Sequence, residues 1–173
     1  MRQKAESGEL DLCFFDETGF SPNPPLQSGW SLRGQTREYG PVSHRQRVNV
    51  LGCLQKGVRL VWETLTHTVA RHDVIAFFDR MAETIEKKTV VVLDNAAIHH
   101  GALMRNKQME WEKKGLHLLY LPPYSPEFNA IEIVWKQAKY FWRRFVALPG
   151  DALQHEVESL MHGFGSKFTI AFQ

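Results

Sequence analysis

Short apolar runs rich in β-branched residues alternate along the chain with longer stretches in which apolar residues recur every three or four positions. The first pattern is typical of β-strands, and the second of helices that pack one face on a core. Strands are therefore predicted at residues 10–15, 48–54, 58–66, 89–93 and 116–121. Three residues that include Gly57 separate the second and third runs, which predicts a hairpin. Residues 89–93 form a continuous β-branched run, as in a strand buried on both faces, and residues 116–121 are predicted to be another buried strand.

Four stretches carry the helical spacing. They are residues 72–87, 101–114, 129–146 and 151–162. Gly115 suits the position just after a helix, and Pro149 followed by Gly150 interrupts the pattern between the last two stretches. Three consecutive strands, followed by strands that alternate with helices, predict an α/β fold with a mixed sheet covered on both faces.

Length and composition limit the class of protein. The chain has 173 residues, 43% hydrophobic and 23% charged, so we expect residues 1–173 to form one globular domain. A net charge of +2 neither demands nor excludes a nucleic-acid partner. The sequence contains no apolar run long enough to cross a bilayer and no secretory signal pattern. Cys13 and Cys53 lie in apolar runs without metal-binding spacing, so buried free thiols are expected.

Two aspartates occupy equivalent places, because Asp16 and Asp94 each follow an apolar run directly. A carboxylate at the C-terminal end of a buried strand is held by a rigid element and reaches the crevice where open α/β sheets bind ligands. The alternative is that each aspartate begins a turn, a position that aspartate favours. Two such residues, followed by Glu132 on a predicted helix, favour a shared acidic site.

Glu132 has two interpretations. Asn129 and Glu132 have the spacing of a capping box, in which each side chain bonds a backbone amide at the start of the helix. However, the neighbours of Glu132 on both sides are apolar, and a carboxylate among them needs a strong partner such as a metal ion. The residues alone leave both interpretations open.

Three converging carboxylates without His or Cys ligands suit hard, oxygen-preferring cations, so the predicted cofactor is two ions of Mg²⁺ or Mn²⁺. Two such ions stabilise both the attacking and the leaving oxygen of an in-line phosphoryl displacement. A glycosidase also uses carboxylates, but that use would explain two acids rather than three and would leave the basic segments without a role.

Several motifs occur in an order that resembles one known family. They are residues 15–20 (FDETGF), 29–30 (GW), 33–35 (RGQ), 93–99 (LDNAAIH) and 121–132 (LPPYSPEFNAIE), then Trp135 and Lys139. Together they resemble the DDE catalytic domain of insertion-sequence transposases of the Tc/mariner superfamily, over about residues 10–146. The resemblance implies an RNase H-like fold, which is a five-stranded mixed sheet flanked by helices.

By matching positions, the resemblance implies that Asp16, Asp94 and Glu132 are the catalytic residues and the metal ligands. The 37 residues between Asp94 and Glu132 are somewhat more than the family's commonest spacing. Ala130 stands where the family usually has proline, which would loosen the start of the helix without removing the carboxylate.

Four neighbouring residues receive expectations of their own. Asn95 and His99 match family positions, and we expect them to orient the acids or a bound water, with turn capping as the alternative. Glu17 adjoins Asp16, but strand neighbours point to opposite faces, so a structural role is expected for it. Trp135 is expected to pack against the sheet.

Two groups of basic residues accompany the acids. One group is Lys136, Lys139, Arg143 and Arg144, on the helix of Glu132; the other is Arg33, Arg37, Arg45 and Arg47, in the segment after Asp16. A charge run is usually a solvated face. Beside a phosphodiester site, contacts with DNA phosphates are favoured instead, and they would carry no sequence information.

The activity that the resemblance implies is that of a DNA transposase. Water cleaves a phosphodiester at the transposon end, and the freed 3′-hydroxyl then attacks target DNA. The implied partners are double-stranded DNA, both transposon ends and target, and a second copy of the chain in a homodimer. A cytoplasmic, nucleoid-associated location and no membrane partner are expected.

Family members carry N-terminal helix-turn-helix domains, and residues 1–173 are expected to lack one. Weak DNA binding of little specificity is therefore expected from these residues alone. Two alternatives stay open: a non-transposing remnant or domesticated DNA-binding domain, and a stand-alone RNase H-like nuclease.

Overall fold

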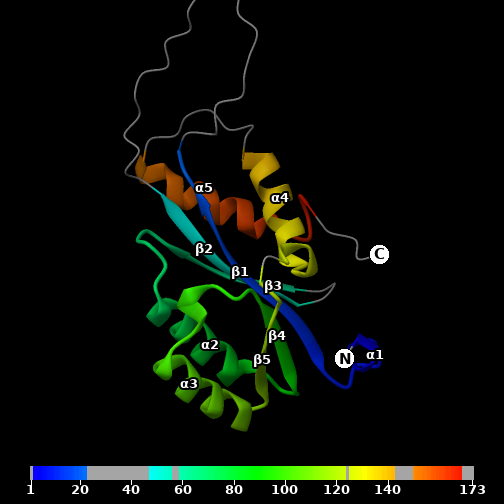
Figure 1. The fold of residues 1–173 in the computed structure, drawn as a ribbon. Helices are drawn as coiled ribbons and strands as arrows, with labels where there is room; N and C mark the ends of the chain where they lie inside the picture. Colours follow the sequence, from blue (N-terminus) through cyan, green and yellow to red (C-terminus); the bar gives the residue numbers. More distant parts are fainter. Residues whose placement is uncertain (1, 23–46, 56–58, 124, 143–149, 169–173) are drawn as a thin grey trace, which may run out of the picture.

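The computed structural model describes residues 2–22, 47–55, 59–123, 125–142 and 150–168. Its strands form one sheet in the order β3-β2-β1-β4-β5 (Figure 1). The strands are β1 (Asp11–Phe20), β2 (Val48–Gln55), β3 (Arg59–Leu65), β4 (Thr89–Leu93) and β5 (Leu116–Tyr120). Pairs β1–β2 and β2–β3 are antiparallel, whereas β1–β4 and β4–β5 are parallel. The predicted mixed, five-stranded α/β sheet is confirmed.

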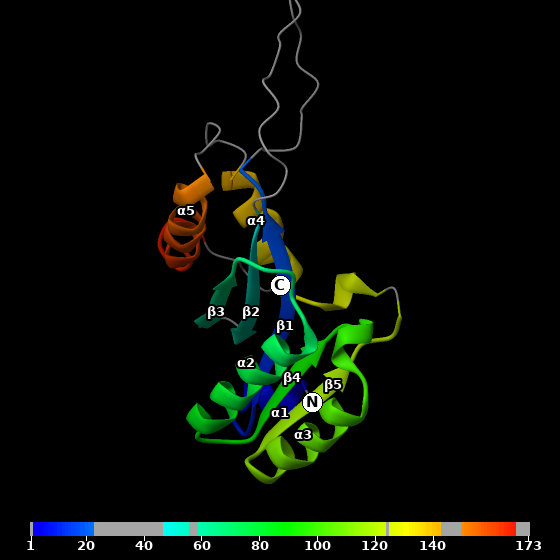
Figure 2. The ribbon, with the colours of Figure 1, turned by 90° about the vertical axis from the view of Figure 1, so that its left-hand side faces the viewer.

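Helices cover both faces of this sheet (Figures 1 and 2). They are α1 (Arg2–Glu6), α2 (Arg71–Thr84), α3 (Ala102–Lys113), α4 (Ile131–Trp142) and α5 (Gly150–His162), with short 3₁₀ helices η1 (Ala97–His99) and η2 (Pro126–Phe128). Helices α2 and α3 pack on one face, and α4 and α5 pack on the other, over β1 and β2. None of the described helices is long and apolar enough to span a membrane.

The alternation of side chains along β1 divides the core in two. Phe15 packs with Phe77 and Phe78 of α2, whereas Phe20 packs with Trp142 of α4 on the opposite face. The predicted free, buried thiols are confirmed on the α2 face, where Cys13 and Cys53 are 3% and 1% exposed. Contact with Cys13, together with burial, raises the pKa of the Cys53 thiol and keeps it protonated.

Strand β1 differs most from its prediction. It continues five residues beyond Phe15, so Asp16 does not end the strand as expected. The cause is the antiparallel pairing with β2, which runs from Cys13 to Phe20 and overrides the turn-forming sequence of residues 16–19. The parallel pairing with β4, in contrast, stops at the pair Phe14–Val92.

Other boundaries shift by a few residues. Strand β5 lies at the edge of the sheet, and Leu119 is 40% exposed, so burial on both faces is wrong for this strand. Helix α2 ends at Thr84, three residues early, and α1, η1 and η2 are not predicted by the pattern. Gly115 has a φ of +94°, which suits a glycine placed just after α3.

Candidate active site

The first two acids lie where β1 and β4 part. The β1–β4 ladder ends at Phe14–Val92, and Asp16 and Asp94 each come two residues later on their own chain segments. Asp16 is inside β1, opposite Gly52 of β2, and Asp94 directly follows β4. The two carboxylates are therefore carried by neighbouring strands, beyond the last rung that joins those strands.

Asp16 faces helix α4. The indole Nε1 of Trp135 donates a hydrogen bond of 3.1 Å to Asp16 Oδ2. Burial, and then the charges of Glu17, Glu132 and Asp94, together raise the pKa of Asp16 to about 7, against a lowering backbone hydrogen bond from Glu17. Both Asp94 and Glu132 thus lie near enough to act on Asp16. The charges of the other two predicted acids therefore act on Asp16, although among the described residues the three carboxylates do not all lie within 4.8 Å of one another.

Glu132 enters this group through the start of α4, but not as part of a capping box. Asn129 is 3% exposed, and its Nδ2 donates a 2.9 Å hydrogen bond to the carbonyl oxygen of Phe15. Asn129 Oδ1 has no hydrogen-bond partner among the described residues, so the side chain does not cap the helix. The capping box is wrong because this amide ties α4 to β1 instead. Glu132 itself is exposed, one position into α4.

Asp94 sits in a polar environment. Its Oδ1 accepts a hydrogen bond from the Ala96 amide at 3.0 Å and lies 2.9 Å from His99 Nδ1, which is also 3.3 Å from the backbone carbonyl oxygen of Asp94. The contact with His99 holds the pKa of Asp94 below its usual range, although partial burial opposes this shift. Asn95 is exposed, and its amide oxygen contacts the His100 ring.

His99 links Asp94 to Glu17 across the α2 face of the sheet. The His99 side chain is fully buried, with Nδ1 against Asp94 and Nε2 3.6 Å from Glu17 Oε2. Burial alone would lower the pKa of His99, but the contacts with Asp94 and Glu17 outweigh it and raise the pKa to about 9. The prediction that Glu17 points away from Asp16 agrees with this position, but its buried ionic partner could not be read from strand alternation.

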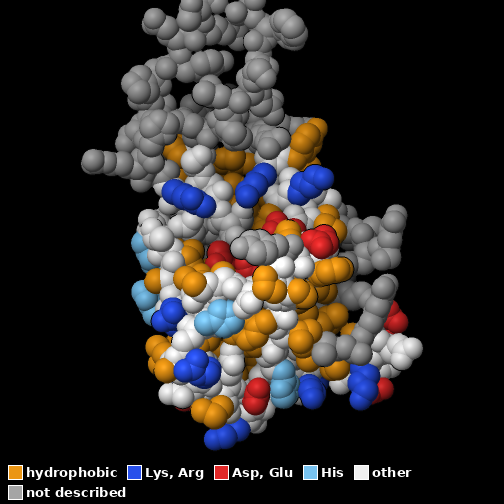
Figure 3. Space-filling view, in the orientation of Figure 1, with side chains coloured by type: hydrophobic (Ala, Val, Ile, Leu, Met, Phe, Trp, Pro, Cys, Tyr) orange, Lys and Arg blue, Asp and Glu red, His pale blue; other side chains and the backbone are white. Residues whose placement is uncertain are grey.

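The basic residues are only partly described. Arg47, Lys136 and Lys139 are exposed. Arg33, Arg37, Arg45, Arg143 and Arg144 lie outside the described residues. Figure 3 shows acidic side chains gathered over β1 and the start of α4, with Lys and Arg side chains nearby over α4 and α5. This acidic patch bordered by basic side chains is a surface that suits cations and phosphates together.

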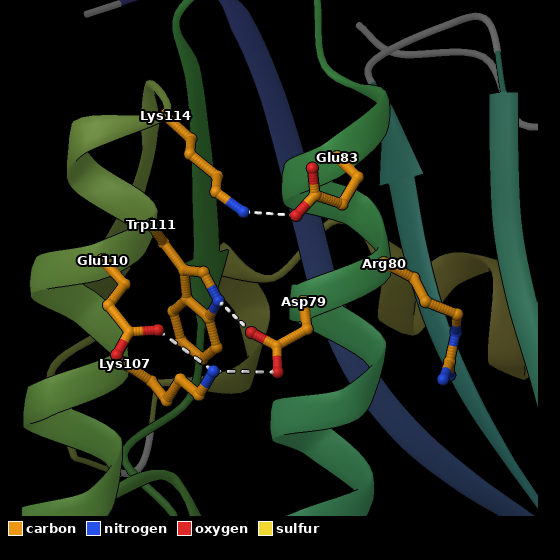
Figure 4. Close-up of a pocket in the computed structure, with 7 residues that line it drawn as sticks. All are labelled: Asp79, Arg80, Glu83, Lys107, Glu110, Trp111 and Lys114. Carbon is orange, nitrogen blue, oxygen red and sulfur yellow. Dashed lines mark hydrogen bonds and ion pairs between the residues drawn. The ribbon is translucent and has the colours of Figure 1, made fainter.

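A charged hollow between α2 and α3 is distinct from the acidic group (Figure 4). Lys107 contacts both Asp79 and Glu110, and the Trp111 indole donates a 2.8 Å hydrogen bond to Asp79. Lys114 pairs with Glu83, and Arg80 pairs with Glu63 of β3. The seven lining residues therefore all have partners. These ion pairs and hydrogen bonds connect α2 with its neighbours and leave no lining side chain free to bind a ligand.

His67, His72 and Asp73 form another group with metal-ligand atoms close together. Asp73 Oδ1 lies 3.1 Å from His67 Nε2 and 3.4 Å from His72 Nε2, while Oδ2 accepts a 2.8 Å hydrogen bond from the Ala70 amide. The Asp73 carboxylate closes the start of α2, and both imidazoles are exposed. Helix capping accounts for the position of Asp73, and the two histidines are exposed side chains that pair with its other oxygen.

Trp135 packs against the sheet as predicted, and its position depends on Gly52. A Cβ at position 52 would lie 2.5 Å from Trp135 Cη2 and 3.2 Å from Ile131 Cδ1. Gly52→Ala should therefore displace the indole and lower the free energy of unfolding by about 1–3 kcal/mol. Urea unfolding measures this loss, and tryptophan fluorescence reports the displaced ring.

The matched control is Gly19→Ala in the adjacent strand. There the added Cβ meets only the guanidinium of Arg47, an exposed and flexible group that can move aside. We expect little change in unfolding free energy. Equal losses in the two variants would contradict the proposed contact between Gly52 and Trp135.

The chain is similar to known proteins in sequence and in fold. Residues 11–151 match the family model described as DDE superfamily endonuclease. The insertion element IS630 uncharacterized 39 kDa protein of Shigella sonnei is 25% identical over 134 residues, covering 75% of this chain and 38% of that protein. The chain thus spans well under half the length of this curated relative.

Two solved structures share the fold at low identity. The Mos1 transposase catalytic domain with raltegravir and Mn has a TM-score of 0.62 at 10% identity, covering 93% of this chain and 74% of that chain. The Mos1 strand transfer complex has a TM-score of 0.57 at 16% identity, covering 94% of this chain and 57% of that chain. These likenesses confirm the expected RNase H-like fold. Because the family model matches most of its length, the chain belongs to the DDE superfamily endonucleases.

Proposed function

We propose that residues 1–173 are the catalytic domain of a DNA transposase that cleaves phosphodiesters at transposon ends and joins them to target DNA. The observation that carries the proposal is the burial of Asp16 beside the negative charges of Glu17, Glu132 and Asp94, which together raise the pKa of Asp16 to about 7. Burying a carboxylate beside other acids lowers the stability of the fold. Perturbed pKa values of this kind are typical of functional sites. Family membership supports the same conclusion.

The acidic group fits divalent metal ions. Asp16 is held by burial and by neighbouring negative charges in a state that resists ionisation, and a cation would relieve both costs. Asp16, Asp94 and Glu132 would hold the ions, and their oxygen-only donor set suits Mg²⁺ or Mn²⁺. When bound, two ions would stabilise the charge on the attacking and leaving oxygens of a phosphoryl displacement. The Mos1 catalytic domain with Mn supports this choice of metal.

The residues of the chain position the reaction. In the first step the oxygen of water forms a bond to phosphorus, the bond from phosphorus to the 3′-oxygen breaks, and a 3′-hydroxyl is released. In the second step the oxygen of this 3′-hydroxyl bonds to the phosphorus of a target phosphodiester, the bond from that phosphorus to the target's 3′-oxygen breaks, and the proton passes to the released target 3′-hydroxyl. Both steps are in-line displacements without a covalent enzyme intermediate. Trp135 and the Glu17 amide bond the Asp16 carboxylate, and the Ala96 amide with His99 holds Oδ1 of Asp94, so both carboxylates are oriented by the chain.

The remaining parts of the proposal concern partners. Exposed Lys136, Lys139 and Arg47 would contact the phosphates of double-stranded DNA, together with Arg33, Arg37, Arg45, Arg143 and Arg144 outside the described residues. The Mos1 strand transfer complex supports DNA as the substrate. A second copy of the chain, in a homodimer, is proposed as a further partner. We also propose that the protein acts in the cytoplasm, where the DNA of a bacterial insertion element lies.

Asp94→Asn tests the function directly. The substrate is a labelled duplex with a pre-cut transposon end carrying a 3′-hydroxyl, mixed with plasmid as target in the presence of Mn²⁺. The wild-type protein should nick DNA and join the end to the plasmid, and Asp94→Asn should lose both activities by at least about 100-fold. Asp16→Asn and Glu132→Gln should show the same loss.

Glu127→Gln is the matched control, because Glu127 is an exposed acid on η2 near the start of α4. Its activity should remain within about twofold of the wild type, as expected for a surface carboxylate. Unchanged activity in Asp94→Asn would overturn the metal assignment. Hydrolysis without joining would favour a stand-alone nuclease, and salt-sensitive DNA binding without cleavage would favour a non-transposing remnant.

A further inference from the structure

Beyond the pair Phe14–Val92 no rung of the ladder sets the distance between β1 and the residues that follow β4. Asp16 and Asp94 both lie in this unladdered region. A two-ion site needs its ligands held to within a fraction of an ångström. Some other contact must therefore fix β1 relative to Asp94.

The described contacts offer one such connection, through His99 and Glu17. His99 Nδ1 lies 2.9 Å from Asp94 Oδ1, and His99 Nε2 lies 3.6 Å from Glu17 Oε2. Glu17 is the next residue after Asp16 on β1, so the chain of contacts spans from one acid's strand to the other acid. The imidazole lies between two carboxylates and can donate a hydrogen bond to each.

The ring that makes this connection is itself rigidly held. The His99 side chain is fully buried and packs edge-on against Phe15 at a centroid distance of 5.9 Å. The hydroxyl of Tyr120 donates a 2.9 Å hydrogen bond to the carbonyl oxygen of His99. Because these contacts hold both the backbone and the ring of His99, a displacement of the Asp94 or the Glu17 carboxylate would break its contact with the imidazole.

Two atoms at the centre of this connection are otherwise unexplained. Glu17 Oε2 and His99 Nε2 are buried, and neither has a hydrogen-bond partner among the described residues. They face each other at 3.6 Å, so an approach of a few tenths of an ångström would satisfy both. The Glu17 side chain is 23% exposed, but its Oε2 atom is buried, and a buried carboxylate oxygen is costly unless it is paired.

We propose that Glu17 is a positioning residue of the active site, which acts through the buried imidazole of His99 to fix Asp94 relative to the strand that carries Asp16. This role rests on the proposed function and assigns Glu17, which touches neither metal nor DNA, to the geometry of the metal ligands. Supporting partners of this kind typically change metal affinity by about 10- to 100-fold when they are removed.

Three substitutions separate position from charge and from packing. Glu17→Leu keeps the volume but removes the acceptor, Glu17→Asp keeps the charge but shortens the reach, and Glu17→Gln keeps both reach and an acceptor oxygen. We expect Mn²⁺ affinity, measured by electron paramagnetic resonance on the DNA-free protein, to fall about 10-fold or more in Glu17→Leu and Glu17→Asp. Glu17→Gln should retain most of the affinity, and the exposed control Glu127→Gln should not change it.

A purely structural role predicts a different order. An apolar side chain in this buried place would then preserve or increase stability in urea and leave Mn²⁺ affinity unchanged. The proposal instead expects Glu17→Leu to lose affinity whether or not it gains stability. Equal Mn²⁺ affinity in the wild type, Glu17→Leu and Glu17→Asp would overturn it.

A measurement without metal tests the role of Glu17 separately from the proposed transposase function. The Nε2 proton of His99 should give a slowly exchanging signal in ¹H–¹⁵N spectra of the wild type and Glu17→Gln, and Glu17→Leu should lose or shift it. If the wild type binds no Mn²⁺ while this signal behaves as expected, the proposed function fails and the contact stands. If the His99 signal is unchanged in Glu17→Leu, the positioning role is overturned even where DNA cleavage is observed. If Glu17→Leu does not fold, the comparison of Glu17→Gln with Glu17→Asp provides the same test.

Discussion

Asp16→Asn should make the metal-free protein more stable at pH 8 while removing its activity. Burial and neighbouring acids raise the pKa of Asp16 to about 7 in the folded protein, against 3.8 for the ordinary side chain. At pH 8 the folded state must hold an ionised, desolvated carboxylate, which asparagine replaces with a neutral group of the same shape. The upper bound of the gain is about 4 kcal/mol, and solvent screening will reduce it. The retained amide oxygen can still accept the hydrogen bond from Trp135.

The sign of the pH dependence follows from proton binding. The folded state binds the Asp16 proton more tightly than the unfolded state, so the stability from this group is fully present below about pH 4. It is lost as the pH rises towards 7. The difference between Asp16→Asn and wild type should therefore be small at pH 4 and largest at pH 8, in urea unfolding without metal.

Asp11→Asn is the control for this experiment, because Asp11 begins the same strand and pairs with Lys87 at 2.9 Å. It should lower stability slightly or leave it unchanged. Added Mn²⁺ should raise the stability of the wild type at pH 8 and leave Asp16→Asn nearly unchanged. If Asp16→Asn is less stable than the wild type at pH 8, the buried state of Asp16 beside other acids is contradicted.

His99→Leu should have the opposite effect on stability. The substitution removes the buried cation between Asp94 and Glu17 and leaves Glu17 Oε2 without its facing partner. Contacts with these two acids raise the pKa of His99 to about 9, which corresponds to a loss of about 3 kcal/mol at pH 6. Urea unfolding at pH 6 and pH 9.5 measures it.

The pH window of His99 differs from that of Asp16. The contribution of His99 is fully present below about pH 6.5 and is lost as the pH rises through about 9, so the cost of His99→Leu should shrink at pH 9.5. His100→Leu provides the comparison, since His100 is the exposed neighbour and its replacement should cost little stability. A loss of the same size at both pH values would mean that packing, and not charge, explains the effect of His99.

The sequence predicts the sheet well because buried strands need continuous apolar runs. Strand β4 agrees with its prediction at both ends, since its five residues are all buried and its flanking residues are polar. Helix periodicity is similarly informative for α2 and α4, whose buried positions repeat at three and four residues. These elements are defined by local pattern, so a local rule finds them.

The site is less predictable because its details come from tertiary contacts. The turn-forming residues after Asp16 continue as strand only because β2 pairs with them. Asn129 has the spacing of a cap, yet its amide bonds the Phe15 carbonyl from far along the chain. Glu17 is a strand neighbour of Asp16 with the correct predicted face, but its buried facing group, His99, belongs to an unpredicted 3₁₀ helix.

The hydrogen bond from Asn129 to Phe15 also affects how far the length of the chain between Asp94 and Glu132 can vary. Phe15 follows the last residue of β1 that pairs with β4, so its carbonyl is available to a side chain at the start of α4. Glu132 is then located by this anchor three residues before it and by the packing of α4 on β1 and β2, and not by the path from β5 to α4. Insertions or deletions before Asn129 can lengthen or shorten that path and still deliver the third carboxylate to the same place. Such an anchor makes the interval between the second and third acids free to drift in evolution.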